Sequence, residues 1–375
     1  MIYLDNAATT FPKPQVVYDY SDELLRTCAF NAGRGESDES SKATEIIDAA
    51  RLNIASLIPG ATADHIVFTS SATDALNKII LGLDLVEGDT VYISPFEHNA
   101  IVRPLHRLEE NGVKVEILPF KKDNWSLDIE EMRRQFAFNN PSAVFASHIS
   151  NVTGFELPVS VIFDESSKYG SINVLDAAQS LGVFPLPNLA HCDYLIFAGH
   201  KSLYGIFGAG GFAILHDRHL LSAICGGTGS DSLNPEMPES LPQKYEAGSP
   251  NVIAIGALVK SVEWLKKTDV SSHEVMLSNY LISQLRGIPR VKIFYPQKIE
   301  PHGIVSIGVD GYTSSEVGAL LNSKGIAVRT GYHCAPLIHA FIGSLPYEGT
   351  VRLSVGAFTT KEEIDSLVEI LKGIV

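Results

Sequence analysis

The stretch from Val174 to Gly211 contains the two segments that decide the fold, Asp176-Ala-Ala-Gln179 and Ala198-Gly-His-Lys201. Each follows a short apolar run, 171–175 and 194–197, that is typical of a buried strand. In an open α/β sheet, ligands bind in the crevice beyond the carboxyl ends of such strands. A carboxylate and an amine are therefore predicted to face one binding crevice.

This pair of groups matches the needs of pyridoxal phosphate. That cofactor requires a lysine for a Schiff base and an anion that keeps its ring nitrogen protonated. Taken alone, Asp176 is equally typical of a helix cap or turn, and Lys201 of a solvated surface residue. The other strand exits decide between these interpretations.

Three further predicted strands, 65–69, 90–94 and 143–147, also end in polar residues that suit this cofactor. The helix that opens at Ser70-Ser-Ala-Thr-Asp74 offers free N–H groups to a phosphate. Alternation of strands with helical segments predicts a mostly parallel, doubly wound α/β sheet. The candidate residues at its edge are Thr73, His98, Asn151, Asp176, Gln179, His200 and Lys201.

Length and charge bound the functional class. With 375 residues, the chain predicts two domains within one compact body. A formal net charge of -14 argues against nucleic acid and anionic membrane surfaces as partners. No signal peptide is recognisable near Met1, and no apolar run could span a bilayer, so we expect a cytoplasmic protein. Four scattered cysteines indicate neither a metal site nor a disulfide framework.

The remaining segments predict a domain order. Residues 1–13 are expected to form an extended arm that packs with the small domain, and residues 31–41 a loop. A helix is predicted over 43–57. The large cofactor-binding domain is expected to span 14–250 and to end in the long polar loop 225–250, which we expect to be functional. Residues 251–375 are predicted to form a small α+β domain with a helix at 251–267.

Over nearly its whole length the sequence resembles the class V aminotransferases of pyridoxal phosphate fold type I. Within them it is similar to the cysteine desulfurase and selenocysteine lyase group. The resemblance rests on four motifs, of which the last is the most specific and resembles the SufS-like branch. These are Tyr3-Leu-Asp-Asn-Ala-Ala8, Gly199-His-Lys201 with Asp176-Ala-Ala-Gln179, Glu246-Ala-Gly-Ser-Pro-Asn251 and Arg329-Thr-Gly-Tyr-His-Cys-Ala-Pro336.

The resemblance implies roles around the cofactor. Lys201 would bind it covalently, Asp176 would pair with its ring nitrogen and Gln179 would bond its ring oxygen. His98 would stack on the ring, with Asn151 beside it. The phosphate would contact Ala72, Thr73 and His200, and Ser249 would reach the phosphate in a neighbouring subunit, which requires a homodimer with shared active sites.

The resemblance also implies a reaction. Arg352 would hold the substrate carboxylate, a task for which the guanidinium fork is suited, with Asn151 and Arg329 nearby. Lys201 would remove the substrate α-proton. Cys334 would take sulfur from cysteine as a persulfide and leave alanine, and His333 and Arg329 are expected to lower the pKa of this thiol. A sulfur-acceptor protein is the implied partner.

Three positions depart from the family pattern. Ala198 stands where many relatives carry a phosphate-binding serine, Ser37 where relatives often place a histidine, and Thr359 where asparagine is frequent. Two alternatives therefore stay open. One is another reaction of the same cofactor, such as transamination or cleavage of a different amino acid; the other is a catalytically idle relative that binds a sulfur-carrier partner.

Overall fold

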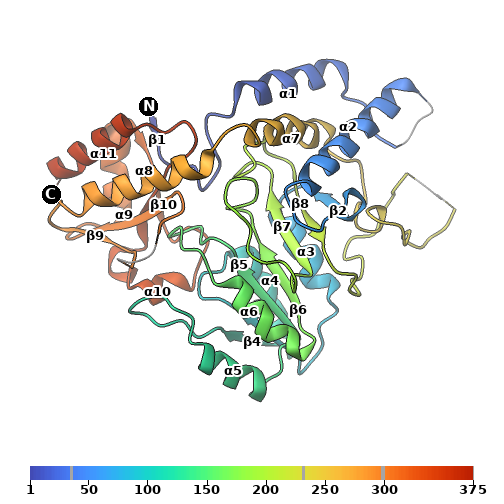
Figure 1. Cartoon of the computed structure of the whole chain (residues 1–375), viewed down its shortest axis with the longest axis horizontal. Helices are drawn as coiled ribbons and strands as arrows, with labels where there is room; N and C mark the ends of the chain where they lie inside the picture. Colours follow the sequence, from blue (N-terminus) through green and yellow to red (C-terminus); the bar gives the residue numbers. More distant parts are fainter. Residues whose placement is uncertain (34–36, 230–232, 297–299, 375) are drawn as a thin grey trace.

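The computed structural model describes residues 1–33, 37–229, 233–296 and 300–374. Two bodies lie side by side, a larger one built on a long sheet and a smaller one that contains the C-terminus (Figure 1). None of the helices in these ranges has the length and apolar content needed to span a membrane.

The larger body is organised by a sheet of seven strands with the order β2-β8-β7-β6-β5-β3-β4. Only β8 among them runs antiparallel to its neighbours, so the predicted mostly parallel sheet is confirmed. The strands are β2 Ile66–Thr69, β3 Thr90–Ile93, β4 Lys114–Ile117, β5 Ala143–Ser147, β6 Ile172–Asp176, β7 Tyr194–Ala198 and β8 Gly210–Ile214.

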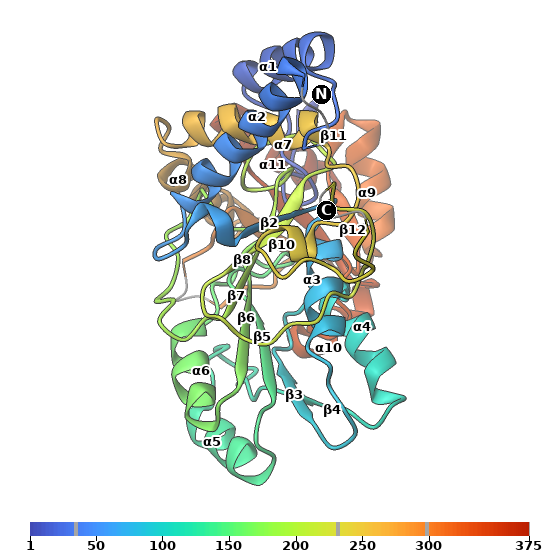
Figure 2. The same ribbon diagram turned by 90° about the vertical axis from the view of Figure 1, so that its right-hand side faces the viewer.

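Helices cover both faces of this sheet because the strands are apolar on both sides. Along β2, Ile66 and Phe68 join one apolar core, whereas Val67 between them joins the other. Figure 2 shows α3 and α4 on the opposite side of the strands from α5 and α6. The helices are α1 Gln15–Thr27, α2 Asp38–Ala55, α3 Ala72–Gly82, α4 Asn99–Glu109, α5 Ile129–Phe138, α6 Val159–Ser166 and α7 Val252–Leu265.

The smaller body has its own core and a four-stranded sheet with the order β12-β13-β10-β9. Its strands are antiparallel, β9 Val291–Ile293, β10 Ile304–Val309, β12 Arg329–Gly331 and β13 Thr350–Ser354. Its helices are α8 Val270–Leu285, α9 Ser314–Ser323 and α11 Lys361–Ile374, whereas α10 Ile338–Ile342, from the same part of the chain, packs on the core of the larger body.

The N-terminal arm lies against this smaller body, with Leu4 in its core. Strand β1, Ile2–Tyr3, pairs in parallel with β11, Ile326–Ala327, and Asp5 forms a bridge to Ser354. Thr9 and Thr10 then donate hydrogen bonds to the His200 carbonyl in the larger body. The arm therefore contacts both bodies before α1 begins.

Two local predictions differ from the structure. The loop expected over 31–41 is shorter, because α2 begins at Asp38 with Ser37 as its N-cap; residues 34–36 lie outside the described ranges. The strand β8 was not predicted, since Gly210 and Gly211 have low strand propensity. At both, a Cβ atom would lie within 2.6 Å of the neighbouring backbone of α3 or β2, so close packing requires glycine.

Helix α7 packs against α1 and α2, and its apolar residues belong to the core of the larger body. The core of the smaller body starts, apart from Leu4, at Leu277 in α8. The chain therefore crosses between the two cores close to the start of α8.

Candidate active site

The carboxyl ends of β2, β3, β5, β6 and β7 meet at one edge of the large sheet and line a single cavity there. The structure brings together in this cavity most of the residues that the sequence predicted. They are Ala72, Thr73, His98, Asn151, Asp176, Gln179, His200 and Lys201. Ser249 is not among them, because it lines a separate cavity of about 550 Å³ beside the 225–250 loop.

Asp176 and Lys201 form the charged centre of the cavity. Burial lowers the pKa of Lys201 and raises that of Asp176, and the attraction between the two groups opposes both shifts. One oxygen of Asp176 accepts the Ala178 N–H at 2.9 Å, which fixes the carboxylate. A lowered pKa favours the uncharged amine, which is the nucleophilic form that Schiff-base formation requires.

His98 lies at the start of α4, where its Nδ1 accepts the Ala100 N–H at 3.0 Å. Burial, followed by the charges of Lys201 and Arg352, lowers the pKa of His98 to about 4. The ring is therefore neutral near pH 7, with its proton on Nε2. A neutral flat ring suits stacking on an aromatic cofactor.

One side of the cavity is formed by the first turn of α3. Ser71 caps this helix by accepting the Asp74 N–H, and first-turn N–H groups have no partner within a helix. Across the cavity, the buried Nδ1 of His200 lacks a hydrogen-bond partner among the described residues. A partly buried amine, a partly buried carboxylate and an unsatisfied imidazole in one cavity with a helix start fit pyridoxal phosphate. The alanine at position 198 is buried at the end of β7.

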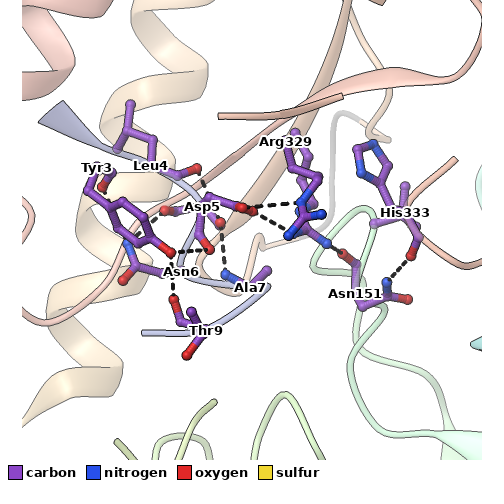
Figure 3. Close-up of polar contacts among 12 residues, drawn as sticks. Tyr3, Leu4, Asp5, Asn6, Ala7, Thr9, Asn151, Arg329 and His333 are labelled. Atoms are coloured by element: carbon purple, nitrogen blue, oxygen red, sulfur yellow. Dashed lines mark hydrogen bonds and ion pairs between the residues drawn. The ribbon is translucent and has the colours of Figure 1, made fainter. Parts of the chain in front are cut away.

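Arg352 projects from β13 of the smaller body and is 3% exposed. Its Nη1 donates to the Asn151 carbonyl at 2.9 Å, and its Nη2 pairs with Asp5 at 2.7 Å. Arg329 in the adjacent β12 reaches the other oxygen of Asp5 through its Nε at 3.2 Å (Figure 3). The two arginines predicted to bind substrate therefore share one carboxylate.

Cys334 lies on a turn in which both His333 and Cys334 have positive φ, 47° and 56°. Such angles are uncommon outside glycine and concentrate at functional sites. The Cys334 carbonyl accepts the Asn99 N–H at 2.6 Å, which ties the turn to the start of α4. The residue is exposed, and its thiol interacts electrostatically with Lys201 and Arg352.

The structure does not give His333 the role expected of it, which was to lower the pKa of the Cys334 thiol. Its ring is buried, and Nε2 lies 2.7 Å from the Thr350 hydroxyl. Burial, and then the Arg352 charge, holds the pKa of His333 well below its usual value. A neutral imidazole supplies no positive charge to Cys334. What His333 does contribute is its carbonyl, which accepts the Asn151 side chain at 2.8 Å (Figure 3).

Two of the three departures from the family pattern, Ser37 and Thr359, have structural roles. Ser37 caps α2 by accepting the Ser40 N–H and does not line the cavity. The hydroxyl of the buried Thr359 accepts the Gly356 N–H at 3.0 Å. Both side chains thus have a local backbone partner.

Sequence reasoning missed Lys13, Glu97 and Asp5. The carbonyl of His200, directly before Lys201, accepts hydrogen bonds from Thr9, from Thr10 and from the buried Lys13 amine at 2.8 Å. Burial lowers the pKa of Lys13 to about 7. The only signal for these contacts was the position of Lys13 in a turn stiffened by two prolines.

Glu97 lies fully buried beneath the cavity, where its carboxylate accepts both the N–H and the hydroxyl of Ser147. Burial raises the pKa of Glu97 to about 7, with a smaller contribution from Asp176. Glu97 directly precedes His98, and its hydrogen bonds to Ser147 join the ends of β3 and β5. Its position at a strand exit was visible in the sequence, but not its partners.

Comparison with known proteins identifies the family. The family model described as aminotransferase class-V matches residues 2–367. The chain belongs to the class V aminotransferases. Pyridoxal phosphate is the cofactor of this family and hence of this enzyme, in agreement with the fit of the cavity.

Curated relatives give a consistent likeness. The chain is 32% identical to a cysteine desulfurase of Pectobacterium atrosepticum, and the match covers 100% of this chain and 93% of the relative. It is 30% identical to a probable cysteine desulfurase of Vibrio cholerae, with coverage of 98% and 92%.

Solved structures agree with this likeness. An apo cysteine desulfurase from Thermococcus onnurineus has a TM-score of 0.92 at 28% identity, covering 100% of this chain and 94% of that one. A cysteine desulfurase from Escherichia coli, solved in an S-sulfonic acid form, has a TM-score of 0.86 at 27% identity, with coverage of 99% and 94%. These matches confirm the predicted fold type I architecture.

Proposed function

We propose that this class V enzyme is a cysteine desulfurase, which converts L-cysteine to L-alanine and retains the sulfur on Cys334 as a persulfide. One observation supports the proposal most strongly. An exposed thiol lies on a strained turn that is tied to the cavity, since the Cys334 carbonyl accepts the Asn99 N–H and the His333 carbonyl accepts the Asn151 side chain. The named relatives support the same reaction.

The cofactor-binding roles are part of this proposal. Asp176 would keep the ring nitrogen protonated, Gln179 would bond the ring oxygen and His98 would cover the ring face. Ala72, Thr73 and His200 would bind the phosphate. When bound, pyridoxal phosphate supplies an electron sink that stabilises negative charge at the substrate α-carbon.

The chain's own residues would carry out the remaining steps. Arg352 would bind the substrate carboxylate, with Asn151 holding the guanidinium in place through its carbonyl. Lys201, whose pKa is lowered by burial, would accept the α-proton. The thiolate of Cys334 would attack the substrate sulfur, so that the new S–S bond forms as the C–S bond to the β-carbon breaks.

The proposal extends to partners and organisation. Selenocysteine would be a second substrate, and a sulfur-acceptor protein would remove the persulfide at the exposed Cys334. Ser249 would reach the cofactor phosphate of the other subunit in a homodimer, since it lines a cavity apart from that of Lys201 in its own chain. We also propose an arm over 1–13, a large domain over 14–250, a small domain over 251–375 whose first helix, α7, packs on the core of the larger body, and a cytoplasmic location.

The test is a product assay on the purified enzyme with pyridoxal phosphate bound. With cysteine, we expect sulfide in the presence of a thiol reductant and an equal amount of alanine. Cys334→Ala should lose at least about 99% of sulfide release, because removal of a catalytic nucleophile costs two or more orders of magnitude. It should keep the visible absorbance of the bound cofactor. Absence of both products from a parent enzyme that retains the cofactor would refute the proposal.

A further inference from the structure

Asp5 connects the two arginines of the candidate substrate site. Its Oδ1 lies 2.7 Å from Arg352 Nη2, and its Oδ2 lies 3.2 Å from Arg329 Nε. Figure 3 shows the Asp5 side chain, which comes from the N-terminal arm, pointing toward Arg329. The side chains of Asp5 and Arg352 are only 14% and 4% exposed, so their interaction is largely shielded from water, whereas Arg329 is 53% exposed.

The arm holds Asp5 at a fixed distance from Arg352. On either side of it, the Ser354 N–H donates to the Leu4 carbonyl at 2.8 Å, and the Ala7 N–H donates to the Ser354 hydroxyl at 2.9 Å. Ser354 lies two residues after Arg352 on β13. The backbone that carries the acid is therefore joined to the strand that carries the arginine.

Without Asp5 this pair of arginines would be unfavourable. Arg329 and Arg352 are directly opposite each other in the pairing of β12 with β13. Like charges in that arrangement destabilise a sheet. Arg352 is also buried, which lowers its pKa, and the charge of Asp5 is the largest influence that opposes this shift. Asp5 thus offsets the cost of burying the Arg352 charge and holds the side chain in place.

Arg352 nevertheless retains donors for another anion. A guanidinium has five N–H donors, and Asp5 and Asn151 each accept one. The Nε is buried and has no partner among the described residues. A substrate carboxylate at this donor would give two positive and two negative charges in the cluster.

We propose that Asp5 is a positioning residue for substrate recognition, an inference that rests on Arg352 being the carboxylate-binding residue of the proposed function. Asp5 fixes the guanidinium while the donors that neither Asp5 nor Asn151 occupies stay available for a monocarboxylate. It acts through Arg352 and touches neither substrate nor cofactor. The negative charge of Asp5 also balances the positive charge of Arg329, so a single substrate carboxylate is enough to balance the charge of Arg352.

The test measures L-alanine binding to the cofactor-loaded enzyme by calorimetry, because alanine carries the substrate carboxylate but has no sulfur. Asp5→Ala should raise the dissociation constant about tenfold or more, since a charge-assisted contact to Arg352 is lost. The KM for cysteine should rise by a similar factor while kcat changes less than about threefold, as expected for lost uniform binding. Asp5→Asn keeps an acceptor and should bind alanine as tightly as the parent or better.

Tyr3→Phe is the matched control. It removes the hydroxyl that donates to the carbonyls of Asp5 and Thr9 but leaves the Asp5 carboxylate intact. We expect a lower melting temperature and unchanged alanine binding. If Asp5→Ala does not fold, Asp5→Glu, which shifts the carboxylate by one methylene, should weaken alanine binding severalfold.

The inference is overturned if Asp5→Ala, or Asp5→Glu in its place, binds alanine like the parent, or if Asp5→Asn loses as much affinity as Asp5→Ala. Its failure is separable from failure of the proposed function. A parent enzyme that releases no sulfide, yet binds alanine in an Asp5-dependent way, would refute desulfuration and support the role of Asp5.

Discussion

His98 combines two functions at the scale of a single side chain. Its Nδ1 caps α4 through the Ala100 N–H, and its ring lines the cavity beside Lys201. The low pKa means that neither function depends on a charge near pH 7. The two contributions can therefore be separated by substitution.

We predict different outcomes for two variants of His98. Asparagine is a favourable N-cap, so His98→Asn should keep the stability of the enzyme but lose the stacked ring, lowering kcat about tenfold. His98→Ala should show the same fall in kcat and also lose about 1 kcal/mol of unfolding free energy. Steady-state kinetics and urea unfolding at pH 7 measure both. Equal stabilities of the two variants would contradict the capping role.

Prediction from sequence succeeded for residues that directly follow a strand. Asp176 and Lys201 could be placed together because parallel strands deliver their carboxyl ends to one edge. Asp5 and Arg352 are 347 positions apart, and their contact depends on how the arm lies on the smaller body. The charge state of His333 depends on its burial, which no local pattern indicates.

At the scale of elements, Arg51 links α2, β2 and the long loop that contains Ser249. Its Nη1 lies 2.8 Å from Glu246 Oε1, and the same oxygen accepts the Phe68 N–H. The guanidinium also lies over the Phe68 ring, 4.9 Å from its centroid. The pair is mostly buried, with side-chain exposures of 9% and 19%. It therefore anchors the loop to the edge of the large sheet.

We predict that Arg51→Met costs about 3 kcal/mol of unfolding free energy, because it leaves the Glu246 carboxylate buried without its partner. The double variant Arg51→Met with Glu246→Gln should be more stable than Arg51→Met alone, since the unpaired charge is gone. Urea unfolding of the four proteins of this cycle gives the coupling energy. Strict additivity of the two single effects would show that the pair does not anchor the loop.

Element boundaries show where sequence reasoning reaches its limit. Strand β5 coincides with the predicted 143–147, because its buried apolar run is a local pattern. Strand β8 was missed because its glycines are explained only by neighbouring backbone. Helix α7 was expected to open the small domain, yet its all-round apolar surface packs in the larger core. The partner of a helix is a tertiary property that its own pattern does not encode.

At the scale of the whole molecule, one buried acid links the two bodies close to the active site. Glu274 in α8 accepts the Tyr204 hydroxyl at 3.0 Å, and that hydroxyl accepts the Ala357 N–H at 2.8 Å. The Tyr204 N–H in turn donates to the Lys201 carbonyl. Burial raises the pKa of Glu274 to about 8, with the Tyr204 hydrogen bond opposing the shift.

The sign of the resulting pH dependence follows from proton binding. Between pH 4.5, the ordinary pKa of a glutamate, and about 8, the folded protein holds a proton on Glu274 that the unfolded chain has released. The folded state binds more protons in this window, so stability falls as pH rises through it. Glu97, whose pKa is raised to about 7, contributes in the same direction at lower pH.

We predict that Glu274→Gln, which mimics the protonated acid, removes roughly 3 kcal/mol of the stability lost between pH 5 and pH 9. Urea unfolding at several pH values measures this difference. In Glu274→Gln, a smaller fall of stability with pH should remain because of Glu97. As a control, substitution of the exposed Glu369 by glutamine should leave the pH dependence of stability as it is in the parent. If the parent and Glu274→Gln lost equal stability over this range, Glu274 would be ionised in the folded enzyme. The two bodies would then be joined through a buried charge rather than through a neutral, protonated acid.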